Sequence, residues 1–194
     1  MFVAYAAARL GDESRLDELG DALRTGSETL RYMAATLLSR VEGERAADLL
    51  IAGLGAPHVE VRAVAARGMG RKGLTSRAVI EALSSVAFEL DARVRAAATI
   101  ALGKIGSAEA VTALRSFVAD GSDEVRAAAC AALAVAGRRE GVEVVVRALD
   151  DQKRFVGAAA LMALRILVKN DFGVAYSDPP TDDQIRRGIA NAQL

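Results

Sequence analysis

The sequence has very few of the residues from which catalytic and metal sites are commonly built. It contains one cysteine, one histidine and no tryptophan in 194 residues. Cys130 cannot form a disulfide within the chain, so nothing indicates an oxidising compartment, and its alanine-rich surroundings favour a small buried side chain. His58 follows Pro57 at an expected helix start, where a solvent-facing or capping role is favoured. We therefore expect no metal site, no bound cofactor and no nucleophilic triad.

The sequence also lacks an excess of either charge. Lysine plus arginine and aspartate plus glutamate number 25 each, which argues against general binding to nucleic acid or to anionic membranes. Charges or glycines interrupt every apolar run, so no membrane insertion is expected. The apolar residues 1–9 lack a basic start and are read as a helix rather than a signal peptide. A cytoplasmic location is the default expectation.

Aromatic residues make up only 4% of the chain and there are three prolines, although 52% of residues are hydrophobic. Alanine, leucine and valine account for most of this hydrophobic share. Because alanine is the strongest helix former and has a small side chain, this composition predicts helices packed with their backbones close together. The expected fold class is all-α.

A segment that begins with a valine-arginine pair recurs along the chain. Clear copies begin at Val61, Val94 and Val125, and weaker ones at Phe2, Leu30 and Phe155. The six starts, near 2, 30, 61, 94, 125 and 155, are separated by 28, 31, 33, 31 and 30 residues. A regular period of this length is typical of a solenoid.

Each copy is followed by a break and a second stretch whose apolar residues lie on one helical face. Residues 110–118, for example, place Ala110, Val111, Leu114, Phe117 and Val118 on one face. Linkers such as 121–124 combine a glycine with capping and acidic residues. A unit of helix, turn and helix cannot bury its own apolar face, so the units must stack. The sequence predicts a right-handed α-solenoid of about six helical hairpins.

The repeated pattern Asp/Glu-x-Val-Arg-x-Ala-Ala-x-x-Ala-Leu-Gly, followed by Ala-Val-x-x-Leu, resembles the short HEAT-like repeat of bilin lyases. Residues 91–121 match it nearly throughout, and the resemblance covers residues 1–167. Residues 168–194 depart from the pattern. An Asp-Phe-Gly extension similar to 171–173 closes some bacterial HEAT-repeat domains, so we expect a capping segment with a short helix at about 182–192.

An arginine occupies the second position of the three clear copies and of the weaker copy that begins at Leu30. These residues are Arg31, Arg62, Arg95 and Arg126. One interpretation is an anion-binding ladder, but a structural ladder that locks each repeat to the next is favoured. The expected carboxylate partners are Asp91 for Arg95, and Asp120 or Asp123 for Arg126.

The second helices carry a column of polar residues two positions before an apolar anchor. Its members are Asp17, Asp48, Glu81, Thr112 and Glu143. Second helices usually line the concave face of such solenoids, so the column is a candidate site for a basic or polar segment of a partner. The alternative is an ordinary solvated helix face.

These features favour a non-catalytic scaffold that binds a partner protein or peptide on its concave face. The resemblance supports an alternative, a bilin lyase-type or other cofactor-handling subunit that acts with a partner chain. HEAT-like hydroxylases need several His-Glu pairs and HEAT-like DNA glycosylases need aromatics and a basic groove, which this chain lacks. Phe2, Val3 and Tyr5 would be partly bare, so we expect missing upstream residues, or a neighbouring domain or chain against the first helix.

Overall fold

The computed structural model describes residues 1–71, 74–168, 181, 183–184 and 186–187. Within these residues the fold is all α-helical, with eleven α-helices, three short 3₁₀ helices and no strand. The helices are α1 (Phe2–Arg9), α2 (Leu16–Thr25), α3 (Glu28–Leu38), α4 (Glu44–Gly53), α5 (Val59–Gly68), α6 (Arg77–Ser85), α7 (Ala92–Ile105), α8 (Ala108–Val118), α9 (Asp123–Ala136), α10 (Val142–Arg147) and α11 (Arg154–Val168). The expected fold class is confirmed.

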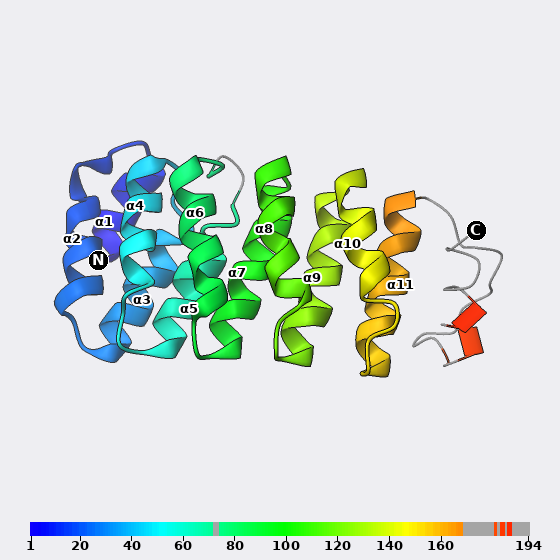
Figure 1. The fold of residues 1–194 in the computed structure, drawn as a ribbon. Helices are drawn as coiled ribbons and strands as arrows, with labels where there is room; N and C mark the ends of the chain where they lie inside the picture. Colours follow the sequence, from blue (N-terminus) through cyan, green and yellow to red (C-terminus); the bar gives the residue numbers. More distant parts are fainter. Residues whose placement is uncertain (72–73, 169–180, 182, 185, 188–194) are drawn as a thin grey trace.

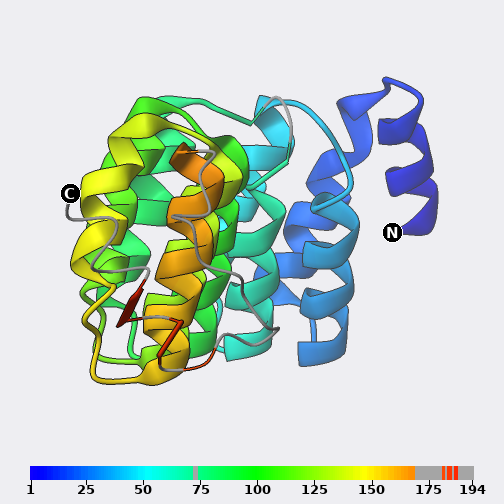
Figure 2. The same cartoon turned by 90° about the vertical axis from the view of Figure 1, so that its right-hand side faces the viewer.

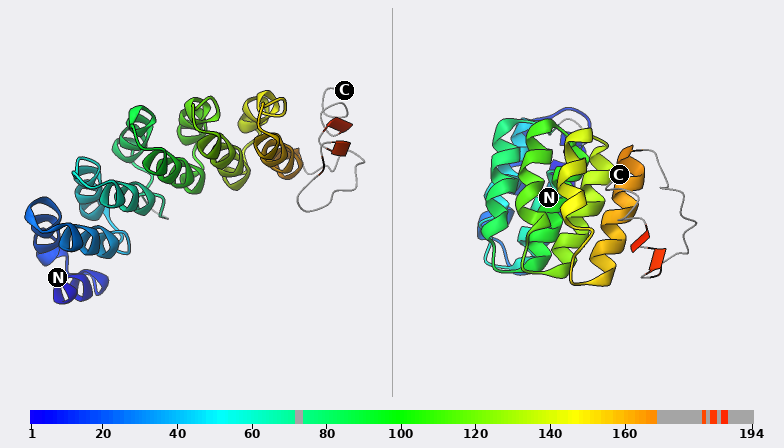
Figure 3. Two further views of the ribbon diagram at one scale, coloured as in Figure 1. Left: turned by 90° about the horizontal axis from the view of Figure 1, so that it is seen from below. Right: turned by 45° about the vertical axis from the view of Figure 1, so that its right-hand side comes forward.

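The helices form five hairpins, from α1–α2 to α9–α10, followed by α11. Figures 1 and 2 place α1 and α11 at opposite ends of the array. In each hairpin the odd-numbered helix comes first, and the two rows of helices form two layers. Seen from below (Figure 3, left), the array bends toward the row of first helices, which therefore lies on the inner side of the bend.

Local signals in the sequence set where the helices begin and end. Ser27, Ser76 and Ser107 each accept a hydrogen bond from a backbone amide in the first turn of the following helix. Gly106 and Gly137 end α7 and α9 in the left-handed conformation, with φ of 63° and 66°. Glycine adopts this conformation without the steric cost that other residues bear.

The first helices approach each other closely through glycine and alanine. A Cβ atom added to Gly70 would lie 2.6 Å from the Cα atom of Ala101, and one added to Gly103 would lie 2.7 Å from the Cα atom of Ala132. Leucines from both rows are fully buried, among them Leu50 and Leu114 on second helices and Leu102 on a first helix. Backbone proximity explains how the chain builds a core with so few aromatic residues.

The two ends of the array differ from the hairpin pattern. Phe2 and Val3 are exposed and Tyr5 is half-buried on α1, as the sequence predicts. Most of the expected C-terminal cap lies outside the described residues. Thr181 and Gln184 exchange two hydrogen bonds, of 2.8 and 3.3 Å, and the described residues 183–184 and 186–187 are helical. This reciprocal pair is the capping box that starts a helix.

Candidate functional site

The repeated arginines lie at the edge of the array where the inter-hairpin linkers run. These linkers join the second helix of one hairpin to the first helix of the next. Arg95 donates through Nε and Nη2 to the two carboxylate oxygens of Asp120, at 2.7 and 2.8 Å. Its Nη1 atom donates to the carbonyls of Glu89 and Leu90, at 2.7 and 3.0 Å. One guanidinium thus ties the preceding linker to the following one.

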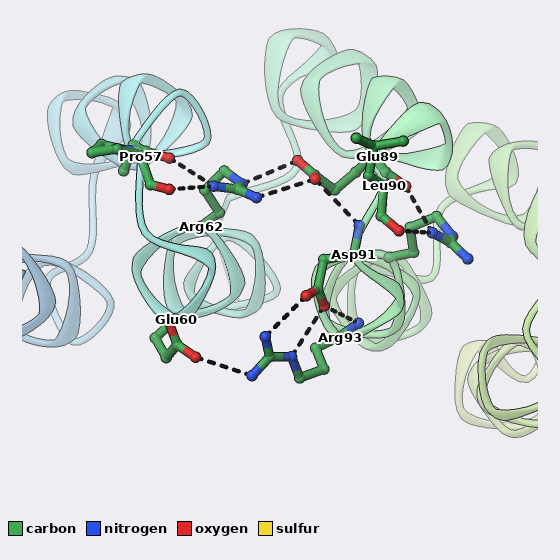
Figure 4. Close-up of polar contacts among 9 residues, drawn as sticks. Pro57, Glu60, Arg62, Glu89, Leu90, Asp91 and Arg93 are labelled. Atoms are coloured by element: carbon green, nitrogen blue, oxygen red, sulfur yellow. Dashed lines mark hydrogen bonds and ion pairs between the residues drawn. The ribbon is translucent and has the colours of Figure 1, made fainter.

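Arg62 and Arg126 repeat this geometry. Arg126 binds both oxygens of Asp151, at 2.7 and 3.0 Å, and the carbonyl of Asp120 at 2.9 Å. Arg62 binds both oxygens of Glu89, at 3.0 and 3.1 Å, and its Nη1 atom donates to the carbonyls of the linker that contains Pro57 (Figure 4). Paired N–H donors that match a planar carboxylate give such contacts their strength and direction.

The expected carboxylate partners of these arginines were one linker too early. Asp91 does not pair with Arg95; it caps α7 and binds Arg93, which also reaches Glu60 (Figure 4). Arg126 pairs with Asp151 rather than with Asp120 or Asp123. The physical reason is the antiparallel hairpin, because the second helix returns the chain to the start of the first helix and places its final carboxylate beside the arginine.

These carboxylates are ionised more readily than in a free chain. Burial of the Asp120 side chain, which is 6% exposed, opposes its ionisation, but Arg95 and the Ser122 amide together hold the pKa of Asp120 below its ordinary value. The balance is the same for Glu89, whose pKa is lowered by Arg62 against the effect of burial. The hydrogen bond from Arg126 lowers the pKa of Asp151. Charged pairs therefore hold the linkers together at neutral pH.

Arg31, the fourth arginine, has no carboxylate partner in the described part of the chain. Its Nε atom donates to the carbonyl of Gly26 at 2.7 Å and its Nη1 atom to that of Leu23 at 3.1 Å. The residue 25 positions later, where Arg95 and Arg126 find their aspartates, is Ala56. The guanidinium therefore turns back toward its own linker.

The five residues of the predicted polar column are exposed on successive second helices, from α2 to α10. Three of them form ion pairs: Asp17 with Arg45 at 2.5 Å, Glu81 with Arg77 at 2.6 Å and Glu143 with Arg147 at 2.6 Å. Thr112 donates to the carbonyl of Ala108. The carboxylates of the column are therefore interleaved with arginines on the same row of helices.

The expectation that the second helices line the concave face does not match the observed bend. In Figure 3 (left) the second helices lie on the outer side, and the first helices lie on the inner side. The close glycine–alanine contacts hold successive first helices together on the inner side. The polar column therefore lies on the outer side of the array.

The exposed face of the first helices carries an apolar group that the sequence analysis missed. On α7, α9 and α11 the exposed side chains include Ile100 (38%), Val135 (67%), Met162 (41%) and Ile166 (59%). We call these four residues the inner apolar patch. Ile100 and Met162 lie six residues after the buried valines Val94 and Val156, and Val135 and Ile166 lie ten residues after Val125 and Val156. An alignment of exposed positions along the first helices would therefore have found them.

The two residues weighed for chemistry occupy structural positions. Cys130 is buried in α9, and burial raises the pKa of its thiol to about 12, which keeps it protonated and unreactive. His58 precedes α5 without a side-chain capping bond, and its Nδ1 atom lies 3.5 Å from a carboxylate oxygen of Glu28.

No group of three metal-binding side chains occurs in the ranges that the structure describes. Among the described helices, none has the length and apolarity of a bilayer span.

The stacked hairpins and their arginine ladder define a helical-repeat protein of the solenoid class. Residues 47–134 and 116–175 match the family of HEAT repeats. These matches cover more than half of the chain, so the protein belongs to the HEAT-repeat family. No curated protein matches the chain in sequence.

Solved structures share this fold. A chain in the complex of CpcE and CpcF of phycocyanin lyase from Nostoc sp. PCC7120 is 25% identical, with a TM-score of 0.64 over 80% of this chain and 65% of that chain. This protein thus spans slightly less than two thirds of that relative. Two engineered proteins have TM-scores of 0.55 and 0.57, identities of 19% and 17%, and coverage of 92% of this chain and 96% and 98% of theirs. At these identities the engineered proteins show the fold alone.

Proposed function

We propose that the protein is a non-catalytic scaffold that binds a partner protein on the inner side of its bend. The observation that carries the proposal is the inner apolar patch, which comes from three successive first helices. Four exposed apolar side chains on one face are more than scattered surface hydrophobics, and such patches are typical of protein interaction sites. The proposal retains binding on the concave face and assigns it to the first helices.

The patch continues into a basic region toward the N-terminus. Arg67 on α5 occupies the place that Ile100 and Met162 occupy on later first helices, 33 residues before Ile100. Lys104 on α7 occupies the place of Val135 and Ile166. Arg67 and Lys104 are exposed, and no ion pair involves either of them among the residues that the structure describes. The face therefore suits a partner segment whose apolar side chains are flanked by carboxylates.

A second candidate function is a lyase-type subunit that acts with a partner chain. It is favoured by the 25% identity to a chain of the CpcE–CpcF complex. Both functions require a protein partner, but only the second requires a bound chromophore or cofactor. Mixing the purified protein with a free tetrapyrrole separates them, because a shifted absorption band that depends on the protein would favour the lyase-type subunit.

Aspartates at Val135 and Ile166 are expected to weaken partner capture strongly. The double variant Val135→Asp/Ile166→Asp places two charges in the patch, and their desolvation on binding should weaken capture at least tenfold (about 1.4 kcal/mol or more). The immobilised protein is incubated with extract of its own cells, and the retained proteins are quantified by mass spectrometry. Because both side chains are exposed, the Tm should not change.

The matched control for this experiment is Leu90→Asp, which changes an apolar side chain that is 96% exposed and lies away from the patch. Leu90→Asp should capture the same partner as the natural sequence. Equal capture by the double variant would refute the proposal. If the double variant only changes the elution volume of the isolated protein, the patch binds a second copy of the chain, and the proposed partner is wrong.

The polar column remains a second proposed contact surface, for a basic partner segment. The variant Asp48→Lys/Glu81→Lys reverses two of its charges and should weaken capture, most strongly at low salt, without lowering the Tm. Capture is compared at two salt concentrations by the same mass spectrometry. If capture is unchanged at both, the column is an ordinary solvated face.

A further inference from the structure

Arg62, Arg95 and Arg126 each bind a carboxylate of the next linker, whereas Arg31 binds none among the described residues. Glu89 and Asp120 each bind two arginines, since the side chain binds the preceding arginine and the backbone carbonyl binds the following one. The carbonyl of Ala56 accepts a hydrogen bond from Arg62 at 2.9 Å. Ala56 therefore occupies the same place in its linker as Glu89 and Asp120, but lacks the side chain that would reach Arg31.

A backbone amide near Ala56 also lacks the carboxylate acceptor that its equivalents have in the complete copies. In the complete copies the carboxylate accepts a hydrogen bond from the amide two residues later: Asp91 for Glu89, Ser122 for Asp120 and Lys153 for Asp151. The equivalent amide is that of His58, and it has no acceptor in the described part of the chain. Both an arginine and an amide are thus available where a carboxylate is missing.

A cavity lies beside the place where the carboxylate is missing. It has a volume of about 180 Å³ and lies between α2 and α4. Arg31 and Ala56 line it together with Gly20, Gly53, Leu49 and Arg24. A water molecule occupies about 30 Å³ in the liquid, so the cavity has room for a carboxylate group and the carbon atoms that carry it. Arg24 pairs with Asp21, which leaves Arg31 as the cation without a carboxylate.

We propose that this cavity, the Arg31 site, binds the carboxylate of a ligand. The three complete copies show that an arginine in this position binds both oxygens of a carboxylate that enters from the next linker. At the Arg31 site the guanidinium would turn from the Gly26 carbonyl toward the cavity and bind the incoming group in the same way. The carboxylate comes from a peptide or from a small free acid. This proposal is independent of the inner apolar patch.

The test follows the Nε–Hε resonance of Arg31 in ¹⁵N-labelled protein, assigned by its loss in Arg31→Lys. Sodium acetate should shift this resonance saturably, whereas sodium chloride at equal ionic strength should not. An acetylated Gly-Asp-Gly amide and an acetylated Gly-Gly free acid provide a side-chain and a C-terminal carboxylate. Binding of either peptide about tenfold more tightly than acetate assigns the site to peptides, and equal affinities assign it to small acids.

Ala56→Asp supplies the missing carboxylate from the chain itself. This variant should raise the Tm, because a hydrogen-bonded pair replaces a guanidinium without a carboxylate. It should also abolish the acetate shift, since the site is filled. The proposal is overturned if acetate acts no differently from chloride, or if folded Ala56→Asp keeps the acetate response. Variants of the inner apolar patch should bind acetate normally, so the two proposals fail separately.

Discussion

Replacement of Asp120 by alanine is expected to lower the free energy of unfolding by about 3 kcal/mol. Removing one partner of a buried ion pair leaves the other charge desolvated, and such changes are strongly destabilising. The Asp120 side chain is 6% exposed and that of Arg95 is 14% exposed, so water cannot fully solvate the guanidinium that remains. The carbonyl of Asp120 also binds Arg126, and the backbone shift that follows would disturb the next step of the ladder.

Urea denaturation monitored by circular dichroism measures this loss, and Glu143→Ala is the matched control. Glu143 also loses an ion pair with an arginine, but both of its partners are largely exposed, so its midpoint should stay at the natural value. A similar loss in both variants would show that the ladder adds nothing beyond a surface charge.

The pH dependence of stability gives the same prediction a second readout. The folded pKa values of Glu89, Asp120 and Asp151 lie below the ordinary values of 4.5 for glutamate and 3.8 for aspartate. The unfolded chain therefore binds more protons in acid, and the stability from these groups is present above about pH 5 and lost as the pH falls through 4 and below. Asp120→Ala should show a shallower acid dependence than the natural sequence.

In the ladder, the sequence predicted the arginines but not their carboxylate partners. The arginines stand out because they recur with the repeat, and the linkers contain many carboxylates. The choice of partner among Asp91, Asp120, Asp123 and Asp151 depends on the length of each second helix. This length decides which linker residue lies beside the arginine, and the repeat period alone does not give it. Once Asp120 is known as the partner of Arg95, the spacing of 25 residues identifies Asp151 as the partner of Arg126. Arg62 pairs with Glu89 across 27 residues, so only the structure shows that Ala56 stands where Arg31 would need a carboxylate.

The faces of the solenoid show a similar limit. Apolar periodicity identified both helices of each hairpin, because it depends only on positions within one helix. Curvature depends on the distance between successive helices, and this distance is set by pairs such as Gly103 and Ala132 that meet across hairpins. The usual role of second helices predicts the opposite face, and for this reason the polar column of the outer row was the expected binding surface.

Replacement of Gly103 by valine is expected to destabilise the protein by about 3 kcal/mol. A Cβ atom at this position would lie 2.7 Å from the Cα atom and 2.8 Å from the carbonyl oxygen of Ala132. Both are backbone atoms, so α7 and α9 must separate. Replacing glycine within a helix gains at most about 1 kcal/mol of helix propensity. This gain does not offset the free-energy cost of the overpacked contact between the two helices.

Gly121→Val makes the same change where a Cβ atom would meet nothing within 4 Å. Chemical denaturation of both variants therefore separates the close contact from the general effect of the substitution. Gly121→Val should unfold near the natural midpoint, and equal midpoints for the two variants would contradict the role given to Gly103. Because this contact also sets the spacing of the first helices, folded Gly103→Val should weaken capture by the inner apolar patch, whose residues sit on the helices it separates.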